Sequence, residues 1–217
     1  MARLAASVRS ERRLLADALQ CFVRAPASAW TFRTLGHACR VRGDELQRRY
    51  RSPELLYRRA VLAAFTGAGA KLRDGPPLGE GLSSRAAAER AAHAAAVFGA
   101  PSYQAVTYIL VRDGTALPWV AEEHRSCALR PAAYDIARGF SGPLRPGEIP
   151  VALDAVEAVL ERLQRGMMLP RLVPAADARE PDDNEAICEA AAALVKAAEA
   201  ARASSHWGMA RSASKYR

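Results

Sequence analysis

A chain of 217 residues, half of them apolar and a quarter charged, has the composition of a folded globular protein, which excludes wholesale disorder. The net charge is +8, and residues 1–60 alone carry +8, with thirteen arginines, no lysine and five acids. Because residues 61–217 balance 18 bases against 18 acids, the pattern indicates a phosphate-facing N-terminal module on a neutral remainder.

Helical signals dominate the N-terminal module. Alanine is abundant and β-branched residues are sparse, so an all-α fold is expected. Ser10, Thr31 and Ser52 are suited to cap helices, and a sharp turn is expected at residues 40–43. The helices predicted in this part of the chain cover residues 10–23, 31–39, 44–50 and 52–66.

Beyond residue 66, apolar periodicity predicts five further helices separated by stretches rich in glycine, proline or charge. They cover residues 84–98, 102–112, 118–140, 150–168 and 184–204. The predicted connections are residues 67–84, 141–150 and 170–183. The tail, residues 205–217, is polar and basic and is predicted to be disordered.

A helix, a turn and a second helix inside a basic three-helix module is the geometry that lays a recognition helix in the major groove of DNA. From Leu14 to Tyr57 the chain resembles, without a gap, the N-terminal domain of TetR-type (TetR/AcrR) transcriptional regulators. The matching positions are Leu14, Leu15, Ala18, Leu19, Phe22, Thr31, Phe32, Arg33, Leu35, Val41, Leu46, Tyr50, Ser52, Glu54 and Leu56. Residues 111–123 and 161–172 resemble parts of that family's larger domain.

The resemblance implies two domains and a function. Residues 1–60 would form a helix-turn-helix DNA-binding domain, and residues 61–204 a helical ligand-binding and dimerisation domain. The chain would then be a dimeric, ligand-responsive transcriptional regulator, more often a repressor in this family, whose partner is double-stranded DNA. Two heads about 34–36 Å apart would occupy successive major grooves, and an effector favouring another spacing would weaken binding.

Family position implies a set of DNA-binding residues in and around the recognition helix. Arg33 and Arg42 would flank the groove, while Arg48 and Arg49 lie on the recognition helix. The whole implied set is Thr31, Arg33, Arg42, Gly43, Asp44, Glu45, Gln47, Arg48, Arg49 and Arg51. The alternative is that these arginines form an ordinary solvated basic surface.

Several residues of the module depart from the family's pattern. Arg40 stands at the usual turn glycine, Gln47 replaces an aromatic residue, and Pro53 replaces a lysine that usually contacts phosphate. Asp44 and Glu45 suit the positive N-terminal end of a helix dipole but would oppose phosphates. The alternative for Glu45 is that it reads a base, since Glu can accept a hydrogen bond from a cytosine amino group. These departures favour a second hypothesis, a TetR-like fold that acts through a protein partner or binds DNA without sequence preference.

The larger domain contains apolar and amphipathic residues suited to a small hydrophobic effector, as the resemblance implies. The candidates are Tyr103, Tyr108, Trp119, His124, Cys127, Phe140, Met167 and Met168. Ordinary core packing is the alternative for each of them, since Met fills a core as well as a pocket. His124 is expected at the surface or as a helix cap.

Dimerisation is expected through helices near residues 151–167 and 184–203, which would pair with those of a second copy as a four-helix bundle. Their apolar faces consist of Val156, Val159, Leu163, Ile187, Ala191, Leu194 and Val195.

Other functions find little support. The chain has no Gly-rich phosphate loop, HExxH or GxSxG motif, so no enzyme, cofactor or metal site is expected. The four cysteines lie far apart and form no CxxC pair, so they are expected to be reduced and structural. Since there is no signal-like apolar run, nor any stretch near the ~20 apolar residues that span a bilayer, a cytoplasmic protein is expected.

Overall fold

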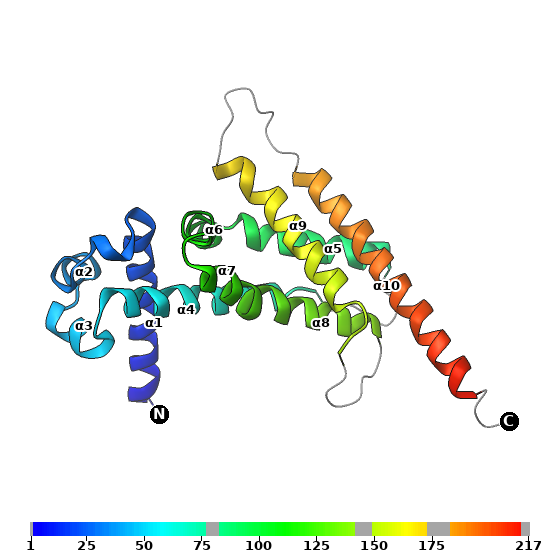
Figure 1. The fold of residues 1–217 in the computed structure, drawn as a ribbon, viewed down its shortest axis with the longest axis horizontal. Helices are drawn as coiled ribbons and strands as arrows, with labels where there is room; N and C mark the ends of the chain where they lie inside the picture. The colour runs from blue at the N-terminus through cyan, green and yellow to red at the C-terminus, as the bar shows by residue number, and fades with distance from the viewer. Residues whose placement is uncertain (1, 77–82, 142–148, 173–182, 214–217) are drawn as a thin grey trace. The chain divides into compact units, whose positions relative to one another are not determined.

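The computed structural model describes residues 2–76, 83–141, 149–172 and 183–213, whose helices are drawn in Figure 1. These residues form helices and turns, and none of them belongs to a strand, so the all-α prediction is confirmed. The chain divides into two compact units. The first combines residues 1–67 with 104–124, and the second combines residues 68–103 with 125–217.

The first unit contains the predicted basic module together with a later part of the chain. Its core is made by side chains such as Phe22, Leu35 and Leu46, none of which is exposed to solvent. Residues 104–124, which the sequence assigned to the larger domain, belong to this unit. The helices are α1 (Ala2–Arg24), α2 (Phe32–Cys39), α3 (Gly43–Tyr50), the first part of α4 (Pro53–Arg73), most of α6 (Pro101–Asp113) and α7 (Pro118–His124).

Two helix ends of this unit differ from the prediction. Ser10 is not an N-cap, because α1 already begins at Ala2; the residues before Ser10 contain no helix breaker. Ser52 does cap α4, accepting a hydrogen bond from the Leu55 amide at 3.2 Å. However, α4 continues past its predicted end at residue 66 and through two glycines to Arg73.

Tertiary packing explains why α4 continues through Gly69. A Cβ at Gly69 would lie 2.4 Å from the carbonyl oxygen of Cys127 and 2.9 Å from the Cα of Ala128. The backbone of α4 therefore passes directly against residues 127–128. This contact offsets the cost of a mid-helix glycine, about 1 kcal/mol relative to alanine.

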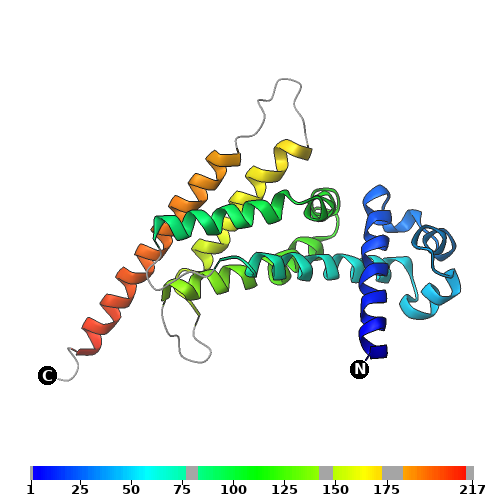
Figure 2. The ribbon, with the colours of Figure 1, turned by 180° about the vertical axis from the view of Figure 1, so that it is seen from behind.

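The second unit is a helical bundle in which α10 packs on α5 and α9, and α8 packs on α9. Figures 1 and 2 show α9 and α10 running side by side in opposite directions. Phe98, Leu160 and Leu194 are among its buried side chains. The complete helices of this unit are α5 (Ser84–Gly99), α8 (Arg130–Ser141), α9 (Leu153–Leu172) and α10 (Asp183–Ala213).

Two features predicted for the later part of the chain differ in the structure, namely one helix and the C-terminal tail. The helix predicted over residues 118–140 is divided into α7, a π-helical turn at Arg125–Leu129, and α8. The tail predicted to be disordered from residue 205 is helical as far as Ala213, as a continuation of α10; residues 214–217 lie outside the described residues. Most of the predicted connections 141–150 and 170–183 also lie outside them.

None of the described helices, taken singly, combines the length and apolar character needed to cross a bilayer. The helices α5 and α6 meet that test only jointly, as a pair bent by 72°.

Candidate nucleic-acid interface

The helices α2 and α3 are eight residues each and are joined by residues 40–42. Thr31 caps α2: the Thr34 amide donates to Thr31 Oγ1 at 3.2 Å, and the Thr31 amide donates to Thr34 Oγ1 at 3.1 Å. This reciprocal pair satisfies two amides that the first turn of a helix leaves without partners. The predicted cap at Thr31 is therefore confirmed.

Two glycines allow the backbones of α2 and α3 to approach each other closely. A Cβ at Gly36 would lie 2.6 Å from the carbonyl oxygen of Val41 and 2.9 Å from the amide nitrogen of Gly43. A Cβ at Gly43 would lie 2.9 Å from the carbonyl oxygen of Phe32. Sequence reasoning missed Gly36; its position in the middle of a short helix, where glycine is unfavourable, was the available signal.

The turn between the helices has a left-handed residue at Arg40, with φ 55° and ψ 40°. Its amide donates to the carbonyl oxygens of Gly36 and His37 at the end of α2. An L-residue in this conformation costs roughly 1–2 kcal/mol, which a glycine avoids. Arg40 thus adopts a left-handed backbone conformation that favours glycine.

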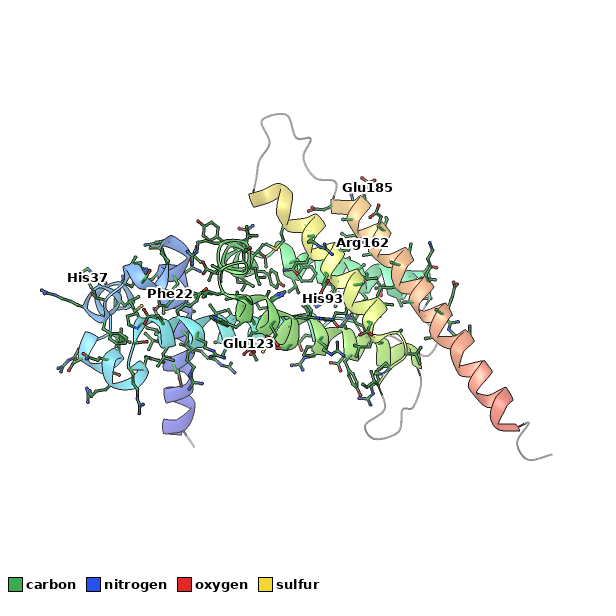
Figure 3. The ribbon with its side chains drawn as sticks, in the orientation of Figure 1. Phe22, His37, His93, Glu123, Arg162 and Glu185 are labelled. Carbon is green, nitrogen blue, oxygen red and sulfur yellow. The ribbon has the colours of Figure 1, made fainter. Side chains whose placement is uncertain are left out.

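The outward face of α3 is polar and basic. Leu46 and Tyr50 anchor the helix in the core, so positions on the opposite side are exposed. That exposed face consists of Asp44, Gln47, Arg48 and Arg51, with Glu45 and Arg49 along one edge. All six arginines of residues 31–51 are exposed, and so is His37, which Figure 3 labels on α2.

Acids on α3 form ion pairs with three of these arginines. Arg42 makes two contacts with Asp44, Nε to Oδ1 at 3.1 Å and Nη2 to Oδ2 at 2.7 Å. Arg48 Nη2 lies 3.9 Å from Asp44 Oδ2, and Arg49 Nη2 lies 2.8 Å from Glu45 Oε1. The hydrogen bond from Arg42 lowers the pKa of Asp44 below its ordinary value. Asp44 is therefore an ionised carboxylate at neutral pH.

A partly buried polar cluster contacts the end of α1 in the first unit. Arg112, at the end of α6, donates from Nη1 to the carbonyl oxygens of Phe22 at 2.7 Å and Val23 at 3.3 Å. The same guanidinium pairs with Asp113, its Nε lying 2.6 Å from Oδ1. Cations suit the last carbonyls of a helix, so this pair fixes the C-terminal end of α1. No local sequence pattern identifies it.

Two buried cysteines lie in the same module, Cys21 on α1 and Cys39 on α2. Burial raises the pKa of Cys39 to about 12, and the neighbouring Cys21 thiol and Asp17 add to the effect. Both are free thiols. Reduced and structural cysteines were expected, and these two lie in the packing between α1 and α2.

The residues predicted to bind an effector are divided between the two units. Tyr108, Trp119 and His124 belong to the first unit, and the remaining candidates belong to the second. Tyr108 is 43% exposed, while Trp119 packs edge-on against Tyr57 with ring centroids 5.9 Å apart.

His124 differs from its predicted place at the surface. It is buried, and its ring packs edge-on against Phe65 with centroids 5.1 Å apart. Burial lowers the pKa of His124 to about 4, so the imidazole is neutral at pH 7. The expectation was wrong because the apolar partner lies 59 positions earlier in the chain, beyond the reach of local patterns.

In the second unit, Tyr103 is buried edge-on against Phe98, with centroids 5.1 Å apart. Met167 and Met168 are buried on α9, and Cys127 is partly buried in the π-helical turn. The side chain of Phe140 lies outside the described residues. These contacts fit core packing, and a role in effector binding stays a prediction.

The predicted dimerisation faces are partly used within the chain itself. Val156, Leu163 and Leu194 are buried within the second unit, so they are not available to a second copy. The other members of the predicted set are partly exposed, namely Val159, Ile187, Ala191 and Val195.

Glu157, a buried acid in the second unit, was not predicted from the sequence. Glu157 of α9 is 1% exposed and accepts hydrogen bonds from Arg125 and, at 2.9 Å, from Arg130 Nη1. The π-helical turn separates these arginines by five positions and directs both toward α9. A buried carboxylate requires such partners, so the cluster joins α8 and its preceding turn to α9.

Among the described residues, no group of three or more His, Cys, Asp or Glu side chains is arranged to hold a metal ion. Comparison with known proteins gave no match to a family model, to a curated protein or to a solved structure.

Proposed function

We propose that the chain is a dimeric, ligand-responsive transcriptional regulator that binds DNA through a helix-turn-helix formed by α2 and α3. The observation that carries the proposal is the character of α3, which is anchored by Leu46 and Tyr50 and exposes Gln47 and Arg48 on its opposite side. A short helix with this division, crossing a second helix at a tight turn, suits the major groove.

The exposed side chains suggest distinct roles in a DNA complex. Arg48 lies at the centre of the outward face, where a guanidinium can donate to guanine O6 and N7. Gln47, one position away, matches the donor and acceptor of adenine. Arg33, Arg42 and Arg51 are exposed and suit phosphates, each neutralised phosphate adding about −0.9 to the salt slope.

Dimerisation and effector response remain part of the proposal. The partly exposed residues of α9 and α10, Val159, Ile187, Ala191 and Val195, would pair with those of a second copy. Two heads would then reach successive major grooves. A small hydrophobic effector would act by its different affinity for the two spacings of the heads.

Selection of duplexes from a genomic fragment pool, followed by fluorescence anisotropy, tests the proposal. The full-length chain should enrich a few palindromic sites and bind them with a strong salt dependence. Arg48→Ala with Arg49→Ala should weaken this binding at least tenfold. The matched control, Arg85→Ala with Arg138→Ala, removes the same charge from exposed positions of the second unit and should change it much less. Equal losses from both pairs would reject the assignment.

The second candidate function is favoured by the ion pairs on α3. Because Asp44 and Glu45 occupy three of the arginines, the head could instead bind DNA without sequence preference or bind a protein. In that case the selection would enrich no site, and binding to selected and scrambled duplexes would be equal.

A further inference from the structure

The outward face of α3 places a hydrogen-bond acceptor beside a donor. The Asp44 carboxylate and the Arg48 guanidinium occupy positions one helical turn apart, and Arg48 Nη2 lies 3.9 Å from Asp44 Oδ2. Both side chains are more than half exposed. The Arg48 Nε also donates to the Asp44 carbonyl oxygen at 3.4 Å, which holds the two groups on the same side of the helix.

A G·C base pair presents the complementary pattern in the major groove. Guanine offers two acceptors, N7 and O6, and the paired cytosine offers the N4 amino donor beside them. A guanidinium next to a carboxylate can satisfy both parts of this edge at once. An A·T pair instead presents one acceptor and one donor on the purine, and an acceptor and a methyl group on thymine. The guanidinium therefore loses the second purine acceptor of its bidentate contact, and the pyrimidine offers the carboxylate no donor.

The carboxylate has the opposite effect on contacts with the DNA backbone. Phosphates compete with Asp44 for Arg42 and Arg48, and they repel its negative charge. In a complex without base contacts, nothing compensates for this repulsion. In a matched complex, the cytosine amino group replaces the arginines as a partner of the carboxylate. Asp44 therefore disfavours non-specific binding more than specific binding.

We propose that Asp44 is a specificity-determining residue, which with Arg48 reads a G·C base pair in the major groove and lowers the affinity for other DNA. The inference rests on the proposed DNA-binding function. It names the feature that the preferred site must contain, a G·C pair in each half-site.

Selection from a duplex library with randomised positions tests the inference on the full-length chain, followed by anisotropy with the selected and a scrambled duplex. Wild type should enrich one G·C pair in each half-site. Asp44→Asn should reduce the preference at that pair about tenfold and should raise affinity for the scrambled duplex about threefold at low salt. Arg48→Ala should also reduce the preference for G·C at the same pair.

Glu122→Gln is the matched control, because Glu122 is an exposed acid of the same unit, on α7, and its replacement changes the net charge equally. Asp44→Asn with unchanged base preference, or with no more gain on the scrambled duplex than Glu122→Gln, would overturn the inference alone. Absence of salt-dependent binding of wild type and all variants to any duplex would overturn the proposed function as well. Circular dichroism of each variant establishes that it is folded.

Discussion

The hydroxyl of Tyr57 donates to the Asp113 carboxylate at 2.5 Å, joining α4 to the end of α6 across 56 positions of the chain. The same carboxylate pairs with Arg112, which holds the last carbonyls of α1. Hydrogen bonds from Arg112 and Tyr57 lower the pKa of Asp113 although its burial acts to raise it. One ionised carboxylate thus connects three helices of the first unit.

Replacing Tyr57 by phenylalanine should lower the free energy of unfolding by about 1.5–3 kcal/mol, because a partly buried hydrogen bond to a charged acceptor is lost. The ring contact with Phe22, with centroids 5.2 Å apart, should persist. Urea denaturation followed by circular dichroism measures the change. Tyr108→Phe removes a hydroxyl from a tyrosine that is 43% exposed and should cost far less. Equal effects of the two variants would show that the Tyr57 hydroxyl contributes no more stability than the hydroxyl of a partly exposed tyrosine.

Gly36→Ala should destabilise the protein by about 1–3 kcal/mol, because the new methyl group would meet backbone atoms of the turn, which cannot move aside. Gly67→Ala is the control: a Cβ at Gly67 meets no atom within 4 Å. That change should stabilise α4 by about 0.5–1 kcal/mol. Thermal unfolding of both variants checks the opposite signs. A neutral Gly36→Ala would contradict the close approach of α2 and α3.

Arg40→Gly should stabilise the fold by about 0.5–1 kcal/mol, because glycine adopts the left-handed conformation of this residue (φ 55°) without steric cost. Arg33→Gly removes a similar charge from a helical position of α2 and should lose about 1 kcal/mol instead. Comparison of the two midpoints of urea denaturation separates the backbone effect from the charge effect. Loss of stability in Arg40→Gly would be the contrary result.

His124 should make stability depend on pH. Its pKa in the folded protein is about 4, below the ordinary 6.5, so protonation favours the unfolded chain. Stability is complete above pH 6.5 and is lost as the pH falls toward 4, by about 2 kcal/mol between pH 7.5 and 5. His124→Gln should remove most of that loss, as measured by urea denaturation at the two pH values. An unchanged pH dependence would exclude a buried neutral imidazole as its cause.

The parts of this structure that the sequence predicted correctly depend on neighbouring residues. Thr31 and Ser52 cap their helices as expected, because a cap is set by residues two or three positions away. The burial of Leu46 and Tyr50 followed from helical periodicity. The predicted site residues on α3 share one face for the same reason.

The remaining features depend on contacts that are distant in sequence. In the sequence, Gly69 suggests the end of a helix. In the structure the helix continues, and the backbone at Gly69 packs against that of Cys127, 58 positions later. His124 was expected at the surface, but in the structure the ring of Phe65 packs against it. Likewise, the hydrogen bond that joins Asp113 to α4 comes from Tyr57, which lies 56 positions earlier. Patterns within a window of a few residues contain no information about such partners.

The thiols between α1 and α2 have a practical consequence. With a pKa of about 12 and almost no exposed surface, Cys39 contains very little thiolate at neutral pH, so it should not react with a maleimide while the two helices stay packed. Cys188, exposed on α10, should react at once. The rate of the slow labelling phase of Cys39 would therefore report how often α1 and α2 separate spontaneously.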